Sequence, residues 1–312
     1  MNQQVTIVMY HYVRPLERSR FPALKALSVE RFVRQLDHIV AEYHPVSVEQ
    51  ILDSLRSPDY ELPPRSILLT FDDGYSDHFQ HVFPHLDSRG IQGCFFPPVE
   101  AVLHHKVLDV NKIQFTLAAY QDAYALLNDA LSLLDEYRSE YELESVDDYR
   151  NRAREVHRYD SATVIAFKRL LQRELPEPVR RDIVNRLFQK YVTLDEAAFA
   201  SELYMTPEQM SCMIRHGMHF GCHGYSHAWM DQLTTEAQSH EVDQSLGLLE
   251  KLGCAGKGWT MCYPYGGYNA SLLKMLQDRG CQLGFSVEPR IADLAAENPL
   301  TLPRIDTNDL PS

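Results

Sequence analysis

The segment ILLTFDDGYSDHF, residues 67–79, decides the fold. Its apolar run leads directly into two adjacent carboxylates, Asp72 and Asp73, and Gly74 follows them. The run predicts a buried strand, and two anions at its tip repel each other unless something positive lies beside them. The rest of the chain must therefore supply a positive charge, or residues that bind one, near this strand end.

Composition excludes several classes of protein. The chain has 312 residues, 45% of them hydrophobic, and a formal net charge of −13. This length supports a large, well-buried core, and the acidic balance argues against nucleic-acid binding. No apolar stretch reaches about 18 residues, so we expect no transmembrane segment. The first residues lack a signal-peptide pattern, so we expect a cytoplasmic protein. The six cysteines lack C-x-x-C spacing, and we expect them to be buried thiols.

Short apolar runs alternate with helical patterns through most of the chain. The runs lie at residues 5–10, 66–71, 93–96, 218–222, 258–263, 282–287 and 302–305. Helical patterns cover 28–43, with Ser28 as N-cap, then 47–55, and 234–253, with Gly253 near the C-terminal end. Strands that alternate with helices predict an α/β fold with a mainly parallel sheet, which could close into a barrel.

The stretch from about 101 to 205 has a different character. It is long, charged and helical, with its clearest helix at 120–137, and it contains no convincing strand. We interpret it as a helical insertion within a single domain that spans residues 1–312. A simple lid or packing layer and a role in shaping the substrate site both remain open.

The two aspartates are expected at the carboxyl end of a parallel strand, where sites gather in such sheets. The structural alternative is a helix N-cap, with Asp73 or Ser76 capping a helix over 76–86. Asp72 is harder to explain as a cap.

A second constellation is GCHGYSHAWM, residues 221–230. His223 and His227 are four residues apart, and the flanking glycines favour a loop after a strand. Two neutral imidazoles and one carboxylate make a three-ligand metal site with open positions. One aspartate then binds the metal, which relieves the repulsion, while the other accepts a proton from an activated water.

The third element is MCYPYGGYN, residues 261–269, where a strand runs into a Pro-Gly loop. Such a loop can point backbone N–H groups inward as an oxyanion hole. Pro-Tyr-Gly-Gly is also ordinary turn chemistry.

Taken together, these residues resemble the polysaccharide deacetylases, the NodB-homology or carbohydrate esterase family four. The matching motifs are T-F-D-D-G at 70–74, H-G-Y-S-H at 223–227 and P-Y-G at 264–266, with Gly224 at a position where Ser or Thr is usual. The resemblance is spread over most of the chain outside the insertion.

The resemblance implies a distorted (β/α) barrel of about seven strands and the removal of an acetyl group from an N-acetylated sugar. It implies that Asp72 is the general base and that Asp73, His223 and His227 hold a divalent metal, zinc above all, with cobalt or nickel as alternatives. It also implies that the backbone N–H of Tyr265 stabilises the oxyanion.

Two features depart from the family pattern. The family's third motif usually has an arginine two residues before its Pro-Tyr-Gly, where this chain has Cys262, and no histidine follows His240 to act as the acid. However, VTIVMYHYVRP, residues 5–15, is an apolar strand that ends on His11. It looks like the family's last strand moved to the front, as in a circularly permuted member. We therefore predict His11 as the general acid, with an ordinary strand-end histidine as the alternative.

In the permuted arrangement, LPRIDTND, residues 302–309, becomes the last strand beside the first. Arg304 could then replace the missing arginine and hold Asp72, and Asp306 could orient His11 and keep it protonated. A surface ion pair between Arg304 and Asp306 is the alternative.

The sequence therefore predicts a metal-dependent N-deacetylase that acts on an N-acetylated carbohydrate of a bacterial surface glycan or its precursor. Two alternatives remain: an amidase of the same fold acting on a non-sugar C–N bond, and a degenerate barrel that binds glycans without turnover. The intact set of Asp72, Asp73, His223 and His227 argues against the second.

Overall fold

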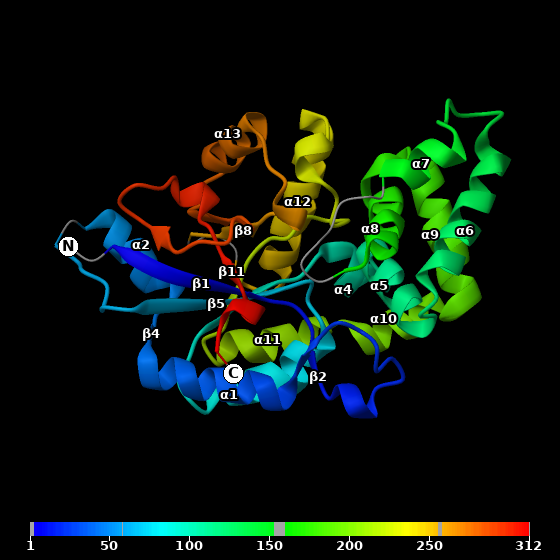
Figure 1. Ribbon diagram of the computed structural model, residues 1–312. Coiled ribbons are helices and arrows are strands. Elements are labelled where there is room, and N and C mark those ends of the chain that lie inside the picture. The colour runs from blue at the N-terminus through cyan, green and yellow to red at the C-terminus, as the bar shows by residue number, and fades with distance from the viewer. Residues whose placement is uncertain (1–2, 58, 153–159, 255–257, 312) are drawn as a thin grey trace. The chain divides into compact units, whose positions relative to one another are not determined.

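The computed structural model describes residues 3–57, 59–152, 160–254 and 258–311 (Figure 1). Contacts divide the chain into two compact units. The sheet unit comprises residues 1–15, 26–106 and 200–312, and the helical unit comprises residues 16–25 and 107–199.

Parallel strands form the centre of the sheet unit. β1 (Gln4–Tyr10), β5 (Ser66–Asp72), β6 (Gly93–Phe96) and β7 (His219–Phe220) pair in that order, and Figure 1 shows β1 and β5 side by side. All seven residues of β5 are buried, as expected for a strand covered on both faces. β11 (Ile305–Asp306) also pairs with β1 in parallel, while β10 (Ala292–Asp293) is antiparallel to it.

A separate two-stranded sheet is also parallel. β8 (Thr260–Cys262) pairs with β9 (Leu283–Phe285). Single parallel bridges join Cys222, just after β7, to Met261 in β8, and Phe285 in β9 to Leu302. Leu302 lies just before β11 in the sequence, so parallel pairing can be followed from β1 through β9 to the segment that leads into β11.

The helices of the sheet unit largely follow the sequence patterns. In α1 (Val29–Glu42), the Ser28 side chain accepts a hydrogen bond from the backbone N–H of Arg31, as an N-cap does. The other α-helices of this unit include α2 (Val48–Arg56), α3 (Phe83–Asp87), α4 (Val99–His104), α11 (Pro207–Arg215), α12 (Thr235–Lys251) and α13 (Ala270–Asp278). Its short strands include β2 (Val13–Arg14), β3 (Leu27–Ser28) and β4 (His44–Pro45). Gly253 follows α12 with φ of +74°, a conformation that glycine adopts without strain.

The segment after the two aspartates differs from the regular helix predicted there. Residues His78–Val82 form a π-helical turn that leads into α3. Pro84 lacks an N–H group, which interrupts the regular hydrogen-bond ladder at this point. Ser76 donates its hydroxyl to the Glu202 carbonyl, and Asp73 accepts from Tyr75, so neither side chain caps this helix. The N-cap alternative is therefore wrong.

The helical unit contains α5 (Asp109–Ala119), α6 (Ala123–Leu134), α7 (Val146–Arg152), α8 (Ala162–Arg169), α9 (Glu177–Tyr191) and the start of α10 (Glu196–Leu203). The described residues of 107–199 include no strand, and residues 153–159 lie outside the described part. Its buried core is built from apolar side chains of α6, α8 and α9, including Leu126, Phe167 and Ile183. The unit begins later than the predicted boundary near residue 101, because α4 belongs to the sheet unit.

None of the helices in the described part of the chain is long and apolar enough to cross a membrane.

Candidate active site

Asp72, the last residue of β5, is held by a buried arginine. Both guanidinium Nη atoms of Arg304 donate to the Asp72 carboxylate at 2.9 Å, in a bidentate pair, and Arg304 is 1% exposed. The same side chain donates to the hydroxyl of Thr70 and to the Ser286 carbonyl, so its position is fixed on three sides. A surface ion pair between Arg304 and Asp306 is therefore excluded.

This pairing sets the charge of Asp72. Burial raises the pKa of the carboxyl, but the Arg304 guanidinium, together with His223, outweighs burial and lowers it to about 2. Asp72 is therefore an anion at neutral pH, and its charge is balanced without a metal.

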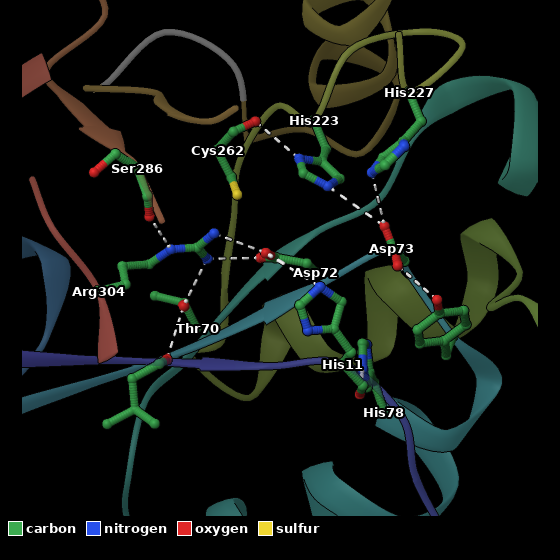
Figure 2. Close-up of polar contacts among 12 residues, drawn as sticks. His11, Thr70, Asp72, Asp73, His78, His223, His227, Cys262, Ser286 and Arg304 are labelled. Atoms are coloured by element: carbon green, nitrogen blue, oxygen red, sulfur yellow. Dashed lines mark hydrogen bonds and ion pairs between the residues drawn. The ribbon is translucent and has the colours of Figure 1, made fainter. Parts of the chain in front are cut away.

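Asp73 faces a different set of partners (Figure 2). Its φ of +71° is unusual for a residue with a side chain. Its Oδ1 lies 3.4 Å from Nε2 of His223 and 3.3 Å from Nε2 of His227, while its Oδ2 accepts a 2.5 Å hydrogen bond from the Tyr75 hydroxyl. All three site residues are at most 8% exposed. The structure thus brings the three predicted ligands together.

Two adjacent carboxylates therefore have separate partners. Burial raises the pKa of Asp73 too, but the two imidazoles outweigh it and hold that pKa well below the usual range. Burial lowers the pKa of His227. For His223, burial is outweighed by Cys262 and Asp73, which raise the pKa of this imidazole.

The donor atoms around Asp73 fit a divalent metal. The Nδ1 atom of His223 lies 2.8 Å from the carbonyl oxygen of Cys262. Because a carbonyl oxygen can only accept a hydrogen bond, Nδ1 carries the proton and is the donor. The Nε2 atom is then left to act as a metal ligand. Among the described residues, the buried Oδ1 of Asp73 has no hydrogen-bond partner. One carboxylate oxygen and two imidazole nitrogens lie within 4.8 Å of one another, which is a ligand set typical of catalytic zinc.

A second group of possible ligands, Asp72, His223 and Cys262, also lies within 4.8 Å. Both Asp72 oxygens are already bound by Arg304, and a metal beside the guanidinium would be repelled by its charge. The Asp73 group is therefore the favoured metal site.

His11 lies at the same site, directly after β1. Its Nε2 is 4.0 Å from Oδ2 of Asp72, and its side chain is 42% exposed. His78 contacts the His11 carbonyl through Nε2 at 2.9 Å, which fixes the backbone at this point. The ring is thus partly exposed to solvent beside Asp72.

Asp306 does not reach His11. Its Oδ1 accepts from the backbone N–H and the side-chain amide of Asn308, as the cap of a short turn. The described structure holds no hydrogen bond between His11 and Asp306, so the predicted orienting role is wrong. Asp306 pairs with Met9, two residues before His11, and its carboxylate is captured by its own turn.

Tyr265 lies beside His227, one of the predicted metal ligands. Its ring meets the His227 ring edge-on at 4.6 Å and stacks flat on Trp229 at 4.4 Å. Its φ of +56° is unusual for tyrosine, and strained conformations of this kind persist where surrounding packing holds them. The Trp229 stack supplies such packing in the loop whose backbone N–H was predicted to bind the oxyanion.

Sequence reasoning missed Tyr75. This residue is fully buried, stacks on Tyr12 at 4.0 Å, and ties down one oxygen of Asp73. Burial and the neighbouring Asp73 raise the pKa of its hydroxyl well above the usual value, so it remains a donor. Its place directly after Asp-Asp-Gly was the only available signal.

Comparison with known proteins shows similarity to polysaccharide deacetylases in part of the sequence. Residues 183–284 match the family model described as polysaccharide deacetylase. The putative polysaccharide deacetylase YxkH of Bacillus subtilis (strain 168) is 32% identical over 89 residues. That alignment covers 28% of this chain and 32% of YxkH, so the chain matches about a third of the curated relative's length.

Several solved structures share the fold. The Streptococcus pyogenes deacetylase PplD, determined in complex with acetate, has a TM-score of 0.60 at 18% identity. The superposition covers 99% of this chain and 93% of the PplD chain. IcaB from Ammonifex degensii has a TM-score of 0.56 at 18% identity, with 98% and 93% covered. The deacetylase domain of BpsB from Bordetella bronchiseptica has a TM-score of 0.55 at 15% identity, with 97% and 96% covered.

The chain is therefore similar in sequence to the polysaccharide deacetylases over residues 183–284, and similar in fold to solved deacetylases over nearly its whole length.

Proposed function

We propose that this protein is a metal-dependent hydrolase that removes the acetyl group from an N-acetylated sugar of a surface glycan or its precursor. One observation carries the proposal: two adjacent buried carboxylates are divided between different partners. Asp72 is an ionised carboxylate paired with Arg304 and can accept a proton, while Asp73 converges with His223 and His227. This division suits a hydrolysis that needs both a base and a metal.

The residues suggest a role for each group. Asp72 accepts a proton from the water that attacks the amide carbonyl, because its lowered pKa keeps it ionised at neutral pH. The backbone N–H of Tyr265 stabilises the developing oxyanion. As the C–N bond breaks, His11 donates a proton to the nitrogen, so that acetate and a free amine leave.

Asp73, His223 and His227 would hold the metal, which we propose is zinc, with cobalt or nickel as substitutes. When bound, such an ion would polarise the acetyl carbonyl and lower the pKa of a water ligand. Tyr75 and Cys262 hold Asp73 and His223 in place for it.

We further infer that the sheet unit is a distorted barrel of circularly permuted order. Support comes from the pairing between β1 and β11 and from the single bridges at Cys222 and Phe285, which join successive parallel strands around the unit. In that arrangement His11, at the end of the first strand, takes the place of an acid from the last one. The predicted cytoplasmic location and the single-domain organisation with a helical insertion belong to the same proposal.

The test is a screen of N-acetylated sugars, from monosaccharides to oligomers, for acetate release by the purified protein supplied with Zn²⁺ or Co²⁺. We expect acetate release that a chelator abolishes and added metal restores. Release of acetate from non-sugar amides alone would favour an amidase. Glycan binding without any release would favour a binding module.

A further inference from the structure

The loop between His223 and His227 contains a glycine at a position where the polysaccharide deacetylases, which this chain resembles, usually have Ser or Thr. Gly224 has φ of +76°, and a Cβ added there would lie 2.8 Å from Oε2 of Glu241. Real Cβ atoms essentially never approach a neighbour that closely. The carboxylate of Glu241 therefore fills the space that a side chain at position 224 would need.

Glu241 lies on α12 and is only 5% exposed. Its Oε2 accepts from the backbone N–H groups of Tyr225 at 2.6 Å and Ser226 at 2.9 Å, and its Oε1 accepts from the Ser226 hydroxyl at 2.6 Å. A buried carboxylate is costly unless donors surround it, and hydrogen bonds to a charged acceptor are about twice as strong as neutral ones. All three donors come from the loop between His223 and His227.

The opposite side of the same loop is fixed by another helix. The first backbone N–H groups of α4 donate to loop carbonyls, from Val99 to Gly224 at 3.3 Å and from Glu100 to Tyr225 at 2.9 Å. His227, which closes the loop, has φ of +59°, an unfavourable conformation that surrounding contacts must hold. The loop is thus clamped between Glu241 and α4.

We infer that Glu241 is a positioning residue that sets the geometry of the histidine pair for metal binding. It occupies the volume that a side chain at position 224 would take, and it anchors the loop from α12. This inference rests on the proposed function only in that His223 and His227 are taken to bind a metal.

The test is titration of metal-free protein with Co²⁺, followed by visible absorption and by competition with a chelator. Glu241→Ala should weaken Co²⁺ binding by about tenfold, the lower end of the effect of removing a group bonded directly to a metal ligand, because Glu241 holds the loop and not the ligands themselves. It should also change the absorption spectrum. Glu241→Gln, which retains one acceptor oxygen, should give an intermediate affinity and keeps the test usable if the alanine variant folds poorly.

Leu249→Ala is the matched control, because Leu249 is buried on the same helix and contributes no polar contact to the loop. It should lower Tm while Co²⁺ affinity and spectrum stay as in the wild type. A second experiment introduces Gly224→Ala into the wild type and into the Glu241→Ala variant. The substitution should weaken Co²⁺ binding more in the wild type, because only there would the new Cβ lie close to the Glu241 carboxylate.

The possible failures can be told apart. A wild-type protein that binds no Co²⁺, or an Asp73→Ala protein that binds it equally well, would overturn the metal site itself. If the wild type binds and both Glu241 variants match its affinity and spectrum, only the role of Glu241 is wrong. Equal losses of affinity in Glu241→Gln and Leu249→Ala would reduce that role to general stability and also overturn the inference.

Discussion

In the helical unit most ion pairs lie at the surface, whereas the sheet unit buries the ion pair of Arg304 and Asp72 at the end of β5. The pairs Arg186–Glu136 and Lys190–Asp129 of the helical unit are between roughly a third and 60% exposed, with Lys112 as a buried exception. In the sheet unit, the side chains of Arg304 and Asp72 are 0% and 3% exposed. The helical unit depends on its apolar core, since exposed pairs contribute about 0–1 kcal/mol.

Buried charges have a different significance. Desolvation of such groups costs several kcal/mol per ion in proteins, so a buried pair adds little net stability. Charges kept at the end of a parallel strand, in a group with perturbed pKa values, therefore point to chemistry. Substitutions can separate these two uses of charge.

The largest effect is expected at a proposed metal ligand. His227→Ala should lose bound metal and activity together, because three ligands leave no redundancy. Metal content of the purified protein and acetate release are the measurements. His216→Ala, at a half-exposed histidine that pairs with Asp87, is the control and should retain both. Full metal content in His227→Ala would remove this residue from the site.

The second largest effect is expected at the proposed general acid, His11. His11→Ala should keep its metal and lose turnover by roughly 10²–10⁴-fold, the usual contribution of a positioned acid. Asp306→Asn is the control: since Asp306 bonds Asn308 and not His11, its rate should stay close to wild type. A rate defect in Asp306→Asn as large as that in His11→Ala would contradict the contacts described here.

Removal of the counter-charge should lower stability. Arg304→Met leaves Asp72 buried without its partner, which should cost about 3–5 kcal/mol in the free energy of unfolding at neutral pH. The folded-state pKa of Asp72 is depressed to about 2. The pair therefore stabilises the folded protein at pH values above the pKa of Asp72 in the unfolded chain, and this stabilisation is lost as the pH falls toward the folded-state pKa. Urea unfolding of both proteins between pH 7 and pH 3 should therefore show a difference that shrinks with acidification. A difference that grows would contradict the assigned charges.

The smallest effect is expected in the helical unit. Arg186→Met breaks exposed pairs with Glu136 and Asp182 and should change the free energy of unfolding by less than about 1 kcal/mol, with little effect on turnover. A loss comparable to that of Arg304→Met would remove the distinction between the two units.

Much of the site could be predicted because its parts are local in sequence. The run that ends at Asp72 and the pair His223 and His227 are visible as short patterns, and strand ends bring them together. Arg304 was predicted as one of two alternatives, because a missing arginine at position 262 required a replacement from another strand.

The remaining features depend on contacts that leave no local pattern. The Asp306 carboxylate accepts hydrogen bonds from Asn308, two residues later, and a strand pattern does not reveal this contact. Glu241 reaches the histidine loop from α12, and nothing in the helical periodicity distinguishes it from other polar residues of that helix. Two-residue strands such as β4 and β10 are too short to show a period.

The central claim is that Asp72 and Asp73 divide the work, with only Asp73 binding metal. The most direct measurement compares metal content and acetate release in Asp72→Asn and Asp73→Asn after dialysis against metal-free buffer and loading with Zn²⁺. We expect Asp72→Asn to retain metal at the wild-type level and lose turnover by roughly 10²–10⁴-fold, while Asp73→Asn loses both. Loss of metal in Asp72→Asn with retention in Asp73→Asn would show that the two roles are reversed.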